Sequence, residues 1–286
     1  MKLSFPDKIF RYRSLGTTYA KEEIDRAICH QEVFLAAGDS LNDPFDFSPA
    51  FQELELKEIN KALRRVGTYR PLLTKARFEE LVGRAVSRTE FRLLSKQFYD
   101  PATRGNIEQQ TAKTVVEGLR KSIRVACFSE TPKNIPMWAH YGGNSSGVCI
   151  VFDFNRSSIE KENTLVPLKV RYENLRPTVS TVELSKFTGR SGSAVRSTSG
   201  NVALMERMCL LKSQDWAYER EWRVFTRSER SASYEKLSCL RVSALIFGPL
   251  ADIGVVMEMK KKYSSKVDIF KARVSDREFD LWNELL

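Results

Sequence analysis

The chain has 286 residues, of which 42% are hydrophobic and 29% are charged, and its formal net charge is +10. This composition excludes an intrinsically disordered chain and suits a globular protein with a sizeable core. No apolar run approaches the roughly 18 residues that span a membrane, and the first residues contain no apolar signal-peptide core. We therefore expect a cytoplasmic protein with no membrane partner.

The positive net charge favours association with a nucleotide, a nucleic acid or another polyanion, without identifying which. The lysines and arginines are dispersed, as on solvated helix faces. The five cysteines and two histidines form no Cys-x-x-Cys pair, so we expect no metal site. The scattered cysteines beside apolar neighbours indicate buried free thiols in a reducing compartment.

The first 122 residues predict two strands, a helix and a helical insertion. Alternating or apolar segments predict strands at residues 9–13 and 33–37, with a helix over 21–30 between them. Residues 38–46 are rich in turn formers and predict a loop. Residues 50–122 carry apolar side chains every three or four positions, which predicts three or four helices, the last from about residue 106 to 121.

The rest of the chain alternates between strands and helices. The expected strands are 123–129, 147–154, 168–172, 216–226, 240–248 and 267–272, and the expected helices or turns are 136–143, 204–213 and 255–263. The Ser- and Gly-rich stretch at 185–201 predicts a mobile loop, with a substrate-covering segment as the alternative. The sequence thus predicts one α+β domain over residues 1–286. Its mixed or antiparallel central sheet forms a cleft, and a helical segment at about 50–122 is inserted after the first strands.

The charged segment at residues 215–223 reads Asp-Trp-Ala-Tyr-Glu-Arg-Glu-Trp-Arg. On a strand, Glu219, Glu221 and Arg223 would share one face, because successive side chains point to opposite faces. Such a face either lines a wet surface, builds a site, or forms an ion-pair network that holds the sheet to the Asn-Asp-Pro-Phe loop. For Arg223 the network is the favoured interpretation.

Three further segments combine polar and aromatic residues: Tyr12-Arg13, the Asn-Asp-Pro-Phe-Asp loop at 42–46, and Cys-Phe-Ser at 127–129 followed by Met-Trp-Ala-His-Tyr at 137–141. Together with Gly147 to Phe152, the charged segment extended back to Lys212, and Ile246 to Pro249, these segments resemble the bacterial domain-of-unknown-function family 2971. The resemblance extends over nearly the whole chain, from about residue 9 to 272. The family name implies no activity.

A weaker resemblance is to ADP-ribosyltransferases, which bind NAD between two small sheets. It implies a substrate, NAD, and roles for ordered residues. Glu221 would stabilise the oxocarbenium-like ribose and Glu219 would orient an acceptor. Arg13, or Arg11, would bind the pyrophosphate. The implied catalytic residues are Glu221, Glu219 and Arg13, and the implied substrate-binding residues are Ser129, Trp138, His140, Tyr141, Asn42, Asp43, Trp222 and Arg223.

Each of these residues also has a structural interpretation. The Asn and Asp residues of the 42–46 loop are typical turn caps. Trp138 and Trp222 suit a core, and His140 between aromatics suits a satisfied structural group. Ser129 is also suited to a hydrogen bond with a neighbouring strand. Cys127 has no visible partner that would lower its pKa, which excludes it as a nucleophile.

Three functions remain open. The first is an NAD-consuming ADP-ribosyltransferase or NAD glycohydrolase that acts as a toxin or anti-phage effector. The second is a nuclease or phosphoesterase that uses the carboxylates of Asp43, Asp46, Glu219 and Glu221 with bound metal. The third is a non-catalytic module that binds a nucleotide or RNA through cationic and aromatic side chains.

Overall fold

The computed structural model describes residues 5–16, 18–52, 75, 79, 84–91, 93, 101–159, 165–180, 183–184, 199–228 and 233–286. The chain divides into two compact units. The first comprises residues 1–46, 120–175 and 209–286, and the second comprises residues 47–119 and 176–208. The single predicted domain with a helical insertion at about 50–122 stays a prediction, and much of that insertion lies outside the described residues.

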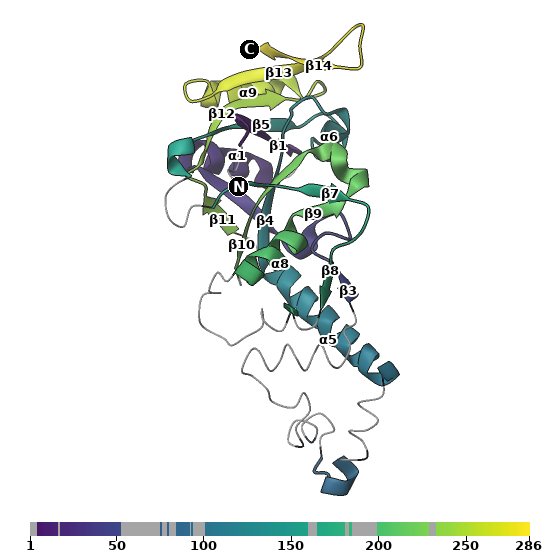
Figure 1. The fold of residues 1–286 in the computed structure, drawn as a ribbon. Coiled ribbons are helices and arrows are strands. Elements are labelled where there is room, and N and C mark those ends of the chain that lie inside the picture. The colour runs from purple at the N-terminus through teal and green to yellow at the C-terminus, as the bar shows by residue number, and fades with distance from the viewer. Residues whose placement is uncertain are drawn as a thin grey trace. The chain divides into compact units, whose positions relative to one another are not determined.

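The first unit is built on a ten-stranded sheet (Figure 1). In order of pairing, its strands are β11 (Ser233–Lys236), β2 (Glu32–Ala37), β4 (Ile123–Ser129), β1 (Lys8–Arg13), β5 (Val148–Phe154), β12 (Leu240–Phe247), β13 (Asp268–Val274) and β14 (Leu281–Leu285). β10 (Glu221–Arg227) pairs with β4 and with β6 (Leu168–Lys169). The β12–β13 pair is parallel and the other pairs are antiparallel. The predicted α+β class with a mixed sheet is confirmed.

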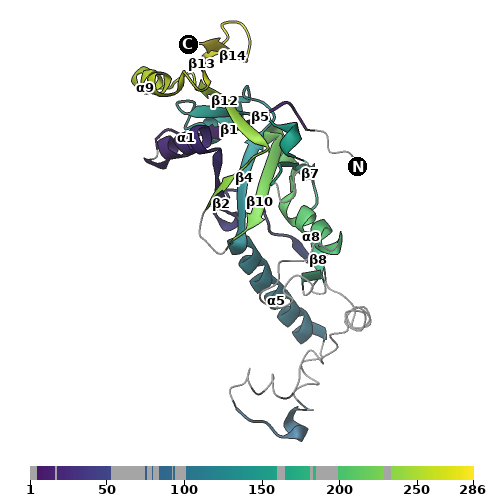
Figure 2. The same cartoon turned by 90° about the vertical axis from the view of Figure 1, so that its left-hand side faces the viewer.

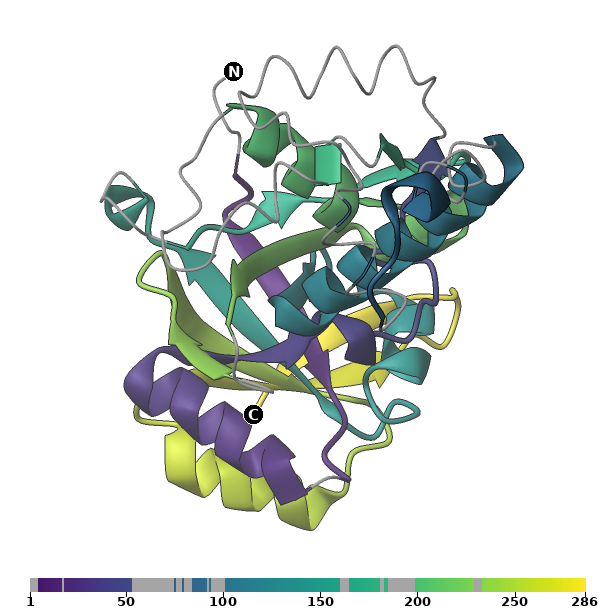
Figure 3. The ribbon, with the colours of Figure 1, turned by 90° about the horizontal axis from the view of Figure 1, so that it is seen from below.

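Alternation along the central strands creates two apolar faces. In β5, Val148, Ile150 and Phe152 join one buried cluster, whereas Cys149 and Val151 join another. The period of two requires this separation. Helices α1 (Thr18–His30) and α9 (Ile253–Tyr263) contribute to the first cluster and α6 (Ile135–His140) to the second. Figures 2 and 3 show α1 and α9 close to one another, on one side of the sheet.

The sheet opens along one edge of β4. Strand β10 pairs with β4 over its entire length, so β1 and β2 share the other edge. The two strands pair with different parts of this edge. Phe10 of β1 pairs with Ser129 of β4, whereas Ala36 of β2 pairs with Val125 of β4. The residues of β4 between these two contacts therefore face an opening bounded by β1 and β2.

Two short strands and three short 3₁₀ helices complete the described part of the first unit. Strand β7 (Arg171–Glu173) pairs in parallel with β9 (Leu211–Ser213). The 3₁₀ helices are η1 (Gly38–Ser40), η2 (Arg156–Ser158) and η3 (Gln214–Glu219). The predicted strand at 168–172 is interrupted at Val170, where pairing changes from β10 to β9. The predicted helix at 204–213 was wrong at its end, because residues 211–213 form β9.

The second unit has a small parallel sheet of β3 (Ala50–Gln52) and β8 (Thr178–Ser180). It also contains α8 (Ser199–Cys209), up to Met208, and most of α5 (Pro101–Ser122). Arg207 of α8 forms an ion pair with Glu183 and donates to the carbonyl oxygen of Thr178 at 3.1 Å. The predicted helix at 106–121 is confirmed and begins five residues earlier. The predicted loop at 185–201 lies outside the described residues up to 198, and it was wrong at residues 199–201, which begin α8.

None of the described helices is long and apolar enough to cross a membrane. The five cysteines are free. Cys149, Cys209 and Cys239 are buried, and Cys127 is half-buried. Cys29 is exposed, so the expectation that all five are buried was wrong at this position, the penultimate residue of α1.

Candidate functional site

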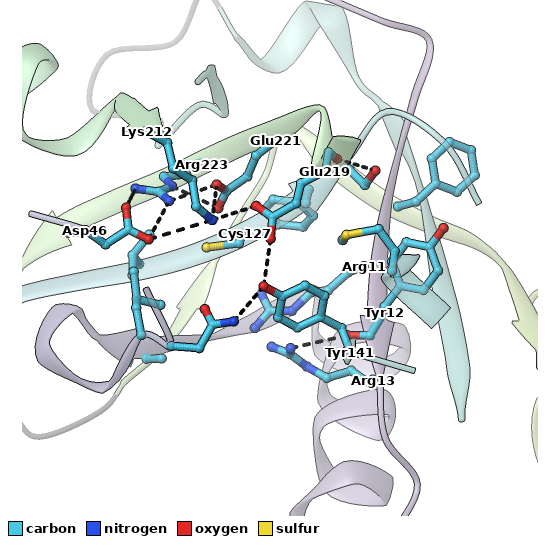
Figure 4. A pocket seen from close by; sticks show the side chains of 18 residues that line it. Arg11, Tyr12, Arg13, Asp46, Cys127, Tyr141, Lys212, Glu219, Glu221 and Arg223 are labelled. Atoms are coloured by element: carbon cyan, nitrogen blue, oxygen red, sulfur yellow. Dashed lines mark hydrogen bonds and ion pairs between the residues drawn. The ribbon is translucent and has the colours of Figure 1, made fainter. Parts of the chain in front are cut away.

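A cavity of about 130 Å³ lies at the opening between β1, β2 and β4. All of its lining residues belong to the first unit. They include charged and aromatic side chains from β1, β4, β10 and the loop after β2 (Figure 4). The polar members are Arg11, Tyr12, Arg13, Asn42, Asp46, Cys127, Ser129, Tyr141, Lys212, Glu219, Glu221 and Arg223.

A left-handed turn brings Glu219 to this cavity. The side chain of Ser213 accepts a hydrogen bond from the backbone N–H of Asp215 and begins η3. Arg220 ends it with φ 46° and ψ 55°, a left-handed conformation that non-glycine residues rarely adopt. The predicted strand at 216–226 was therefore wrong over its first half, and β10 begins at Glu221. Glu219 and Glu221 nevertheless both line the cavity.

Five buried charged side chains form one network beside the turn: Asp46, Lys212, Glu219, Glu221 and Arg223. Arg223 binds both oxygens of Glu221 at 2.8 Å, through Nε and Nη2. Its Nη1 lies 2.8 Å from Oδ1 of Asp46. This contact confirms the interpretation that Arg223 ties its strand to the 42–46 loop. Lys212 Nζ lies 2.6 Å from Glu219 Oε2 and 3.4 Å from Glu221 Oε2.

The two glutamates of the network have opposite pKa shifts. Burial raises the pKa of Glu219, and the charge of Lys212 only partly opposes this effect. Burial also acts to raise the pKa of Glu221, but Arg223 and Lys212 outweigh it and lower the pKa to about 2. Glu221 is therefore a fixed anion that holds the cations, whereas Glu219 is the carboxyl group whose protonation is more easily changed.

Tyr141 connects Glu219 to the loop after β2. Its hydroxyl donates to Glu219 Oε1 at 2.7 Å and accepts a hydrogen bond from Asn42 Nδ2 at 2.9 Å. Burial, followed by the charge of Glu219, raises the pKa of the Tyr141 hydroxyl. Asn134, which caps α6, donates to the carbonyl oxygen of Tyr218. The helix that carries Tyr141 at its end is thereby held against the turn that carries Glu219.

Two arginines of β1 line the cavity and share one carboxylate. Arg13 Nε lies 2.9 Å from both oxygens of Glu23 in α1. Arg11 Nη2 lies 3.1 Å from Glu23 Oε1 and donates to the carbonyl oxygen of Phe34 at 2.6 Å. The Arg11 guanidinium also lies 5.5 Å from the ring centroid of Phe128. These contacts hold both guanidinium groups beside the opening.

Of the eleven predicted site residues, seven line the cavity: Arg13, Asn42, Ser129, Tyr141, Glu219, Glu221 and Arg223. Ser129 supports the site through the backbone, because its hydroxyl donates to the carbonyl oxygen of Glu219 at 2.7 Å. It thereby fixes the backbone of the left-handed turn.

The other four are not among the lining residues. Trp138 is fully buried and donates to the carbonyl oxygen of Pro132 at 2.8 Å. Trp222 is buried and donates to Glu130 at 2.9 Å. His140 is exposed, 3.1 Å from the Tyr218 hydroxyl. Asp43 accepts from the backbone N–H of Phe45 at 2.8 Å, as a turn cap does. For these residues the contacts match the structural interpretations.

Three charged cavity residues were not among the predicted site residues. Lys212 was visible only as the first residue of a family motif. For function, Asp46 was considered only as a carboxylate of the metal-dependent alternative, and Arg11 only as the alternative to Arg13. Cys127 also lines the cavity, and burial, followed by the charge of Glu221, raises its pKa well above the ordinary value, as expected for a thiol that is not a nucleophile. Within the described residues, no group of three or more His, Cys, Asp or Glu side chains is placed to hold a metal ion.

Residues 137–224 match a family model described as "Protein of unknown function (DUF2971)". The match runs from α6 into β10 and includes Tyr141, Lys212 and Glu219. The predicted resemblance over nearly the whole chain was therefore too extensive. No curated protein and no solved structure matches the chain, and the comparisons give no support to the resemblance to ADP-ribosyltransferases.

Proposed function

We propose that the cavity binds the nicotinamide ribose end of NAD and cleaves its N-glycosidic bond, as in an ADP-ribosyltransferase or NAD glycohydrolase. The observation that carries this proposal is the Glu219 carboxylate. It lines a cavity, it is buried, and it is held from two sides by Tyr141 and Lys212. A fixed carboxylate in a water-poor site is the group that stabilises a developing positive charge on a sugar ring.

In the proposed reaction, the bond between C1′ of the ribose and the nicotinamide nitrogen breaks. Nicotinamide leaves with the bonding electron pair, and the positive charge moves to the ribose ring. Water or an acceptor hydroxyl then bonds to C1′ and releases one proton. Glu219 would stabilise the charged ring and receive or pass on that proton, because burial raises its pKa towards the operating range of a general base.

Glu221 takes a positioning role in this proposal, in place of the catalytic role that the sequence suggested. Both of its oxygens are bound by Arg223, and Lys212 lies at 3.4 Å. A ribose hydroxyl would have to compete with these charged donors. By contrast, Glu219 is held by one hydroxyl and one ammonium group, which leaves lone pairs on both oxygens for a ligand.

The size of the cavity limits what can enter it. Ligand pockets commonly enclose about 300–1,000 Å³, whereas this cavity encloses about 130 Å³. We therefore propose that the ribose ring and its bond to nicotinamide enter the cavity, and that the adenosine half of NAD remains outside. A defence role as a toxin or anti-phage effector would follow from depletion of NAD.

The two other predicted functions are less well supported by these contacts. A two-metal nuclease would need the carboxylates of Asp46, Glu219 and Glu221 as metal ligands, and Lys212 and Arg223 bind these carboxylates instead. A non-catalytic module would bind nucleotide without turnover, and it is an outcome of the experiment below.

The experiment measures nicotinamide release from NAD by the wild-type protein, Glu219→Gln and Glu258→Gln, alone and with DNA, RNA or cell lysate. Glu258 is an exposed carboxylate on α9 and serves as the matched control. We expect wild-type and Glu258→Gln proteins to release nicotinamide, and Glu219→Gln to be slower by about 10²–10⁴-fold. Equal rates for the folded Glu219→Gln protein, or no release under any condition, would contradict the proposal.

A further inference from the structure

Arg11 is a buried cation whose hydrogen-bonding capacity is not used up by the protein. Its side chain is 2% exposed, and it lines the cavity. Nη2 contacts Phe34 and Glu23. Nε and Nη1 have no hydrogen-bond partner among the residues that the structure describes. Buried polar groups of a native protein are normally paired, and unpaired ones are costly, above all when they are charged.

The charge of Arg11 is also incompletely balanced. Among the described residues, Glu23 is the only acidic side chain in ion-pair distance of Arg11, and Arg13 binds both oxygens of that same carboxylate. One negative charge thus serves two guanidinium groups. Beside Arg11 and Arg13, this part of the cavity wall therefore carries one more positive than negative charge among the described residues, which is the arrangement of an anion-binding site.

We propose that Arg11, with Arg13 beside it, binds a phosphate group of the ligand. The unpaired N–H groups of Arg11 would donate to the phosphate oxygens, and the excess charge would be neutralised. The carboxylate of Glu219 lines the same cavity and suits sugar hydroxyl groups. A molecule that carries a phosphate next to a ribose satisfies both groups, so the substrate class is a ribose phosphate, as found in nucleotides.

This inference deepens the proposed function and rests on it for the position of the ribose, but phosphate binding is measurable without turnover. Calorimetric titrations of the full chain with ribose 5-phosphate, ribose, inorganic phosphate and ADP-ribose give the affinity due to each part. We expect ribose 5-phosphate to bind at least about tenfold more tightly than ribose, as charge-assisted hydrogen bonds provide. We also expect it to bind more tightly than inorganic phosphate.

Three variants assign the phosphate preference to Arg11. Arg11→Met is expected to reduce the ratio of the two affinities to about one, Arg11→Lys to restore part of it, and the exposed control Glu258→Gln on α9 to retain it. The wild-type titrations need no variant, so a misfolded Arg11→Met protein leaves the test in place. Equal affinity for ribose and ribose 5-phosphate in the wild type, or an unchanged ratio in Arg11→Met, would overturn the inference.

One outcome separates this inference from the proposed function, and a second tests the assignment of a ribose phosphate. Phosphate-selective binding without nicotinamide release supports the Arg11 site and contradicts NAD cleavage. Equal affinities for inorganic phosphate and ribose 5-phosphate overturn the assignment of a ribose phosphate, because the sugar would then contribute nothing.

Discussion

Replacing Arg223 by Met is expected to destabilise the first unit strongly. Arg223 is fully buried and binds Glu221 at 2.8 Å and Asp46 at 2.8 Å. The change leaves two buried carboxylates with Lys212 as the remaining cation of the network, at 3.4 Å and 3.8 Å. Removing one partner of a buried ion pair lowers the free energy of unfolding by about 3–5 kcal/mol. Because Lys212 still compensates in part, we expect a loss near the lower limit, about 3 kcal/mol.

Urea unfolding followed by tryptophan fluorescence is the assay. All four tryptophans lie in the first unit, so the signal reports that unit. The matched control is Arg156→Met, which breaks an exposed pair with Asp7 and is expected to cost about 0–1 kcal/mol. If Arg223→Met loses no more free energy of unfolding than Arg156→Met, the network does not hold the site together and the reasoning is refuted.

The destabilisation should also depend on pH in a defined direction. The pKa of Glu221 is lowered from 4.5 to about 2 in the folded protein. A lowered pKa contributes stability that is fully present above the unfolded value and lost as the pH falls through the folded value. The difference between wild-type and Arg223→Met proteins is therefore expected to be largest near neutral pH and to shrink between pH 4.5 and pH 2. A difference that grows with acid would contradict this origin.

Substitutions at three positions, Gly147, Arg220 and Tyr141, test the geometry around the cavity, and Gly118→Ala is the matched comparison for Gly147→Ala. Gly147→Ala would place a Cβ atom 2.1 Å from the carbonyl oxygen of Arg13, so urea unfolding should show a loss of about 1–3 kcal/mol. Gly118→Ala on α5, where no described residue lies within 4 Å, should instead gain up to about 1 kcal/mol, measured by urea unfolding followed by circular dichroism because Gly118 belongs to the second unit. Arg220→Gly should be near neutral or stabilising at its left-handed position, whereas Arg220→Val should lose about 1–2 kcal/mol in the same assay. Tyr141→Phe removes the hydroxyl bound to Glu219, and we expect nicotinamide release to fall about tenfold. Equal stabilities within either matched pair, or an unchanged rate for Tyr141→Phe, would count against these assignments.

The elements that the sequence predicted best are those in which one local pattern dominates. The strands predicted from the continuous apolar run of β5 and from the alternation of β1 were confirmed. A strand buried on both faces has a continuous apolar run, and a strand buried on one face alternates, so both patterns can be recognised in the sequence. Strands β11 and β14 were missed. Each pairs with a single neighbour at the end of the sheet, and Trp282 and Leu285 of β14 are exposed, so neither strand has a clear buried face.

The candidate site was predictable as a set of residues but less so as a set of roles. Glu219, Glu221 and Arg223 of the charged segment do line one cavity, although the predicted strand is interrupted at Arg220. A single left-handed residue has no periodic signal, and Arg is not a residue that sequence rules place there. The role of Arg11 depends on Glu23 and Phe34, which are brought to it by tertiary contacts that no local pattern records.

A crystal structure of the protein with ADP-ribose tests the central claim most directly, because it locates the ligand without requiring turnover. We expect a phosphate within hydrogen-bond distance of Arg11 Nε or Nη1, and a ribose hydroxyl on the Glu219 carboxylate. ADP-ribose bound elsewhere on the molecule, or bound in the cavity with Arg11 left unpaired, would contradict the account.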